Sequence, residues 1–151
     1  MKLMTKEFFN PMKSSYYYYL LSPFIMFMLI LMLWMFYPFK NNMLNWNLNS
    51  LYVLCKISMG VYGLMITGWS SNSYFSMLGS IRSIAQSISY EVTFSMSFLL
   101  ILFMINSLNL YNIIIYQKYM WMTLFIWPSS FILLMSMLAE LNRTPFDLSE
   151  G

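Results

Sequence analysis

The chain contains 151 residues, of which 60% are hydrophobic and only 9% are charged. Water-soluble domains typically carry about 25% charged residues, so this chain has too few polar side chains to cover a water-facing surface. One cysteine, Cys55, and no histidine exclude a disulfide scaffold, a zinc finger and an iron–sulfur site built from this chain alone. A net charge of +3 is too small to indicate a nucleic-acid partner. The composition predicts a membrane protein.

Four apolar stretches are long enough to cross a membrane as helices. About 20 helical residues span the roughly 30 Å of hydrocarbon in a bilayer. We expect spans at about 18–37, 48–69, 79–105 and 119–141, separated by polar segments. The predicted fold class is therefore an all-α, polytopic membrane bundle of four helices, forming a single membrane domain over residues 1–151.

Two residues inside these spans are unusual. Lys56 lies about two turns into the second span, where a buried ammonium group is costly. The favoured interpretation is that its side chain snorkels back to the nearby interface or reaches a neighbouring subunit, and a functional role is the alternative. Pro128 predicts a kink in the fourth span, because proline removes a helix hydrogen bond.

The positive charges indicate how the chain is oriented. With four crossings, both ends and the 70–82 loop lie on one side of the membrane. That side carries five lysines and arginines against two on the other, which favours it as the inside. The five are Lys2, Lys6, Lys13, Arg82 and Arg143, and the two are Lys40 and Lys118.

Glu91, in the middle of the third span, is a candidate functional residue. At 100° per residue, Arg82 and Glu91 fall on opposite faces of the helix, so they do not form an ion pair within it. Glu91 then requires another partner, a hydrated cavity or a proton. A proton-relay role and a neutral or paired packing role both remain open for Glu91, whereas Arg82 is more typical of an interfacial anchor.

Four ionisable residues follow the fourth span within a short segment. They could form a coupled titrating cluster, because like charges held together share their protons. A local salt bridge between Glu140 and Arg143, or a solvated loop, fits the same composition. The four residues are Glu140, Arg143, Asp147 and Glu150.

Three motifs resemble one family. AELNRTPFDLSEG (139–151) is similar to the segment that opens the matrix loop after the fifth helix of subunit 1 of mitochondrial NADH:ubiquinone oxidoreductase, respiratory complex I. GWSSNSYFSMLGSIRSIAQSISYEVT (68–93) and KLMTKE (2–7) resemble two further signatures of that subunit, in the same order and spacing. The resemblance covers essentially the whole chain. It implies an internal fragment that corresponds to helices two to five of an eight-helix subunit.

The resemblance implies a function that the chain performs only as part of a larger enzyme. Such subunits of the proton-translocating NADH:ubiquinone oxidoreductase contribute to the ubiquinone cavity and to the charged path that couples quinone reduction to proton pumping. Ubiquinone is then the substrate, and flavin and iron–sulfur clusters belong to other subunits, so the fragment alone is expected to be inactive. The implied partners are other membrane-arm subunits, the hydrophilic subunits at the quinone site and lipid, in the mitochondrial inner membrane, with both ends on the matrix side.

The resemblance also assigns residues. Arg82 and Arg143 are expected near the quinone cavity, no metal site is expected, and Lys56 matches no charged position of the family. An anchoring subunit, or an unrelated secondary transporter that conducts no protons through these residues, is the alternative. The residues expected to relay protons or charge are Glu91, Glu140, Asp147 and Glu150.

Overall fold

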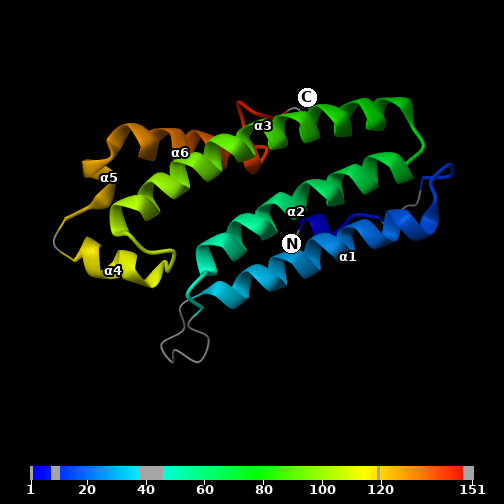
Figure 1. Cartoon of the computed structure of the whole chain (residues 1–151). Helices are drawn as coiled ribbons and strands as arrows, with labels where there is room; N and C mark the ends of the chain where they lie inside the picture. The colour runs from blue at the N-terminus through cyan, green and yellow to red at the C-terminus, as the bar shows by residue number, and fades with distance from the viewer. Residues whose placement is uncertain (1, 8–10, 38–45, 119, 148–151) are drawn as a thin grey trace.

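The computed structural model describes residues 2–7, 11–37, 46–118 and 120–147, and all regular structure in these ranges is helical. The elements are η1 (Lys2–Thr5), α1 (Tyr16–Leu33), η2 (Trp34–Phe36), α2 (Asn49–Ser70), α3 (Tyr74–Ile105), α4 (Tyr111–Gln117), α5 (Met122–Phe125) and α6 (Trp127–Glu140). Three helices, α1, α2 and α3, are long, α6 has 14 residues, and the others are short (Figure 1).

The long helices form an open layer in chain order. α1 packs against α2, α2 against α3, and α3 against α6. Successive helices run antiparallel, so α6 returns beside α3 after the chain has passed through α4 and α5 (Figure 1). α2 and α3 therefore each have packed neighbours on both sides, and together they form the middle of the layer.

Three of the four expected spans are confirmed, and the fourth is corrected. α1 with η2, α2 and α3 are each long and apolar enough to cross a membrane. The expected continuous helix at 119–141 is instead divided, because Pro128 lies at the start of α6 and separates it from α5. Proline is favoured in the first turn of a helix, where its missing N–H is not needed. α6 has 14 residues and is about 21 Å long, which is shorter than the hydrocarbon core.

Small polar residues, and few large apolar ones, are buried where the helices meet. Ser22, Ser83 and Ser136 are almost completely buried. Each hydroxyl donates a hydrogen bond of 2.9–3.1 Å to a carbonyl three residues earlier in its own helix. The serines therefore leave no unpaired donor while allowing close approach of the helices, as in membrane proteins generally. The large apolar side chains face outwards instead.

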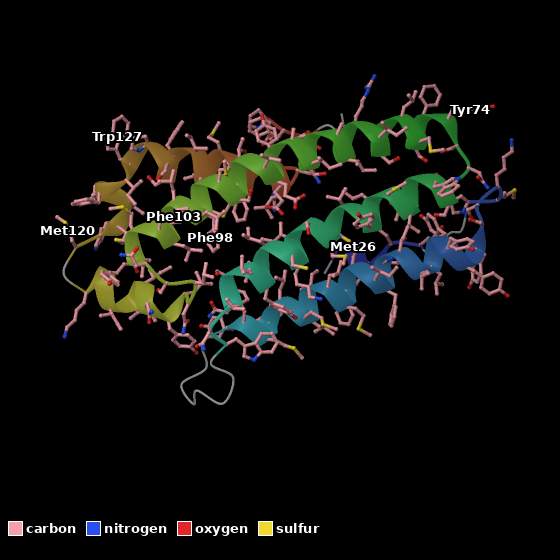
Figure 2. The ribbon with its side chains drawn as sticks, in the orientation of Figure 1. Met26, Tyr74, Phe98, Phe103, Met120 and Trp127 are labelled. Carbon is pink, nitrogen blue, oxygen red and sulfur yellow. The ribbon has the colours of Figure 1, made fainter. Side chains whose placement is uncertain are left out.

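Aromatic side chains mark the two ends of the layer. Figure 2 shows Tyr74 at the start of α3 and Trp127 at the opposite end, at the start of α6, and both are exposed. Aromatic residues are enriched at the two interfaces of a membrane. Their positions agree with helices that cross the hydrocarbon between these ends.

Glycines allow α2 to approach both of its neighbours. A Cβ at Gly68 would clash with the side chain of Ser80 on α3, and one at Gly63 would clash with Met26, which reaches from α1 (Figure 2). A Cβ at Gly60 would meet no atom within 4 Å. Gly68 is thus required by the α2–α3 contact, whereas Gly60 borders open space.

We predict that Gly68→Ala destabilises the protein and that Gly60→Ala does not. The added methyl group at position 68 meets the short, rigid Ser80 side chain, so the helices must separate, at a cost of about 1–3 kcal/mol. Gly60→Ala gains helix propensity of about 0.5–1 kcal/mol without a clash. Thermal unfolding in detergent measures both variants. If Gly68→Ala unfolded at the same temperature as the unmodified protein, close packing of α2 and α3 at Gly68 would be contradicted.

Candidate functional site

A groove of about 480 Å³ follows the layer, and four helices contribute to its lining. It is mostly apolar, and it contains three ionisable side chains, one from each of α2, α3 and α6. All three are partly buried. The lining residues are Met26, Leu29, Ile30, Leu33, Lys56, Ile57, Gly60, Val61, Leu64, Ser87, Glu91, Phe94, Met137, Glu140, Leu141 and Asn142.

Glu91 reaches the groove because of its register on α3. Ser87 and Glu91 are four residues apart, and Phe94 follows by three, so the three side chains share one helix face. That face is the one turned towards α1, α2 and α6 across the groove. Arg82 is exposed and does not line the groove. The structure thus separates the two charged residues of α3.

Glu140 enters the same groove from the end of α6. It is the last residue of this helix, and its carboxyl group lies close enough to Glu91 for the two negative charges to repel each other. The packing of α3 against α6 therefore brings together two carboxyl groups that are 49 positions apart in the sequence, as their numbering shows.

Gln86 joins α3 to the segment after α6. Its side chain is 8% exposed, and Nε2 donates hydrogen bonds to the carbonyl oxygens of Phe146 (2.9 Å) and Ala139 (3.4 Å). The Phe146 ring also packs edge-on against Tyr90, one turn further along α3, with ring centroids 5.1 Å apart. Gln86 lies four residues after Arg82, and this spacing gives no indication of a contact with the segment after α6. The available signal was a long amide side chain in a stretch of small and apolar residues.

The segment after α6 forms a turn that carries Arg143 and Asp147. The Phe146 N–H donates to the Arg143 carbonyl at 2.7 Å, and the Arg143 N–H donates to the Leu138 carbonyl at 3.3 Å. Arg143 is exposed, and it forms no ion pair with Glu140 among the residues that the structure describes. The local salt bridge considered for this pair is therefore not found. Asp147 is partly buried, and Glu150 lies outside the described residues.

Lys56 projects into the groove from α2. Its Nζ lies 5.3 Å from the centroid of the Tyr52 ring, one helical turn earlier. Cation–π contacts at this distance are favourable, and they help to hold an ammonium group at an apolar site. Lys56 thus lies on the same groove as the two carboxyl groups, which the sequence had not indicated.

Within the described ranges, no group of three or more His, Cys, Asp or Glu side chains is arranged to hold a metal ion. The chemistry available to the groove is that of two carboxyl groups, one ammonium group and the polar side chains of Ser87 and Asn142. These groups can bind, release and redistribute protons. They supply no redox centre of their own.

Comparison with known proteins identifies the family. A family model described as NADH dehydrogenase matches residues 1–151. The chain belongs to the NADH dehydrogenase family. It is 45% identical to NADH-ubiquinone oxidoreductase chain 1 of Aedes aegypti over 150 residues, which are 99% of this chain and 48% of that relative. It is 44% identical to the protein of the same name from Papio hamadryas over 151 residues, 100% of this chain and 48% of the relative.

A third relative of the same name, from Locusta migratoria, is 42% identical over 150 residues, 99% of this chain and 48% of its own length. The chain thus spans about half the length of the curated relatives it matches. The family resemblance read from the three motifs is confirmed.

We predict that Gln86→Leu releases the 141–147 segment without unfolding the helices. Leucine keeps an apolar volume but donates no hydrogen bond to Phe146 or Ala139. Without these hydrogen bonds, the free energy of opening the segment falls by about 1 kcal/mol. Amide exchange in the segment then becomes roughly fivefold faster when exchange follows local opening. Hydrogen–deuterium exchange of peptides covering 141–147 measures the change.

Ser95→Ala is the matched control, because Ser95 is a partly exposed polar residue of α3 whose hydroxyl donates only within its own helix, to Val92. Its exchange in the 141–147 segment should equal that of the unmodified protein. Unchanged exchange in Gln86→Leu would contradict a role for Gln86 in holding this segment.

Proposed function

We propose that the chain is part of a membrane subunit of a proton-translocating NADH:ubiquinone oxidoreductase, and that its groove belongs to the charged path that couples quinone reduction to proton pumping. The observation that carries this proposal is the pair of carboxyl groups, Glu91 and Glu140, brought together by α3 and α6 in an apolar groove. Ionisable residues within membrane helices commonly lie on proton or ion pathways. The relatives are named NADH-ubiquinone oxidoreductase chain 1, and this name supports the proposed reaction and its quinone substrate.

The mechanism follows from the electrostatics of the pair. In a groove of low polarity, two negative charges close together are more costly than one. A negative charge that develops nearby, as on a quinone that gains electrons, increases this cost and favours uptake of a proton. Loss of that charge favours release. The carboxyl pair thus converts a change of charge into a change of protonation.

The segment after α6 would connect the groove to the quinone cavity. Arg143 is exposed and available to a substrate or partner, and Asp147 follows within the same turn. Gln86 fixes this turn to α3 one and a half turns from Glu91. We assign Arg143, Asp147, Glu150 and Arg82 to the vicinity of the ubiquinone cavity, where Asp147 and Glu150 continue the charge relay.

The proposal includes the surroundings of the chain. We place it in the mitochondrial inner membrane with both ends on the matrix side, supported by the excess of lysine and arginine on that side. Other membrane-arm subunits and the hydrophilic subunits at the quinone site are the partners, and flavin and iron–sulfur clusters reside in other subunits. Accordingly, the 151-residue chain alone is expected to catalyse no quinone reduction.

Replacing either carboxyl group by an amide tests the function. Glu91→Gln and Glu140→Gln, each in the full-length subunit, keep size and hydrogen bonding but remove titration. We expect the complex to assemble and its ubiquinone reduction to fall by roughly tenfold or more, because positioned acid–base groups contribute factors of about 10²–10⁴. NADH-driven quinone reduction and proton uptake by membrane vesicles measure the effect.

Glu7→Gln serves as the control, because Glu7 is an exposed carboxylate outside the groove. It should retain the normal rate and proton stoichiometry. If Glu91→Gln and Glu140→Gln behaved like this control in assembled enzyme, the chain would be an anchoring subunit and the relay would lie elsewhere.

A further inference from the structure

Lys56 is a charge that the proposed relay does not account for. Within α1, α2 and α3, all of whose residues are described, it is the only lysine. It is surrounded by apolar residues of α2 and is partly buried. An ammonium group in such a position requires a compensating interaction.

The antiparallel packing of α2 and α3 brings Lys56 level with Glu91. The two helices are joined by the turn at 71–73. From that turn, Lys56 lies about 21 Å back along α2 and Glu91 about 26 Å along α3, at 1.5 Å per residue. The two residues therefore differ in height by only about one helical turn, on helices that are in direct contact.

The shape of the groove leaves space between these groups. Gly60 follows Lys56 by one turn on the same face of α2, and a Cβ at that position would have no neighbour within 4 Å. Gly60 therefore leaves space beside the lysine side chain on the groove face of α2. Its observed contact is the Tyr52 ring, 5.3 Å from Nζ, which is a weak and reversible interaction.

The charged groups that face Lys56 come from α3 and α6. α3 contributes Glu91, α6 contributes Glu140, and the α1 residues that line the groove are all apolar. On α2 itself, the nearby titratable group is the Tyr52 phenol, whose hydroxyl donates to the Met32 carbonyl of α1 at 3.1 Å. The groove thus holds two acidic groups and one basic group.

We propose that Lys56 is a positioning residue of this groove, an ammonium countercharge to the two carboxyl groups, Glu91 and Glu140, that line the groove with it. A positive charge beside an ionised carboxyl group offsets the cost of placing that carboxylate among apolar side chains. The inference rests on the proposed function, because it assigns the ionic balance of the same relay.

Removing the ammonium group in the full-length subunit of the assembled complex tests this role. In Lys56→Met, the two carboxyl groups lose their countercharge, so their protonated forms persist to higher pH. We expect the acidic limb of the rate–pH profile for ubiquinone reduction to move upwards by about one pH unit, the size expected for one charge several Å away in a partly solvated protein. Infrared difference spectra should show more protonated carboxyl signal at neutral pH.

Two further variants make the result specific. Lys56→Arg keeps the positive charge and should retain the normal profile, although its planar group packs differently. Lys13→Met removes one positive charge from an exposed residue outside the groove and should also leave the profile unchanged. If Lys56→Met does not assemble, Lys56→Gln provides a neutral, polar replacement for which the same upward shift is expected.

The outcomes separate this inference from the proposed function. Suppose that Glu91→Gln slows the enzyme, but Lys56→Met and Lys56→Gln keep the rate–pH profile and the infrared carboxyl signal of the unmodified enzyme. Lys56 then only snorkels to the interface, and the inference is overturned. If Glu91→Gln and Glu140→Gln have no effect, the proposed function itself fails. In the Glu91→Gln background, Lys56→Met should produce a smaller shift, because one of the two groups it acts on has been removed.

Discussion

The packing of α3 between two neighbours is the constraint on which the groove depends. α3 contacts α2 on one side and α6 on the other, and it supplies Glu91 to the space between them. This arrangement requires small residues at the contacts, since Gly68 and Ser80 leave no room for a methyl group between α2 and α3. In a membrane, helix association gains little from the hydrophobic effect and relies on such close packing. A shift of α3 would therefore move the carboxyl pair along with the helix contacts.

The cost of charge in an apolar groove explains the composition of its lining. A single carboxylate in such surroundings is costly, and a second one nearby is more so. The Asn142 side chain and the ammonium group of Lys56 are the polar groups that the lining offers to offset this cost, because the Ser87 hydroxyl donates to the Ile84 carbonyl in its own helix. Neither of them is a fixed bidentate partner of the kind that arginine provides. The groove is thus better suited to groups that change their protonation than to a permanent salt bridge.

Sequence reasoning predicted those features that a single segment determines. Long apolar runs correctly gave α1, α2 and α3, and three motifs correctly gave the family. The fourth span was predicted as continuous because its hydropathy is high, whereas Pro128 starts a new helix and shortens it. Glu91 was recognisable because a carboxylate interrupts an apolar helix.

Contacts between side chains of different helices could not be predicted from single segments. Glu140 was assigned to a cluster with Arg143 because the two are close in sequence, yet its charged neighbour in the structure is Glu91. The role of Gln86 likewise depends on Phe146, which comes from a distant segment. Helical periodicity specifies which side chains share a face, but it does not specify which face of another helix lies opposite.

A single rigid helix connects the two parts of the site. Gln86 and Tyr90 hold the segment after α6, and Glu91 occupies the groove, all within less than two turns of α3. Glu140 and Phe146 are themselves only six positions apart, on either side of the turn at Arg143. Displacement of that segment by a substrate or partner would therefore act on Glu140 through the chain and on Glu91 through α3. The repulsion between two like charges depends on their separation, so such a displacement would change the electrostatic interaction between Glu91 and Glu140.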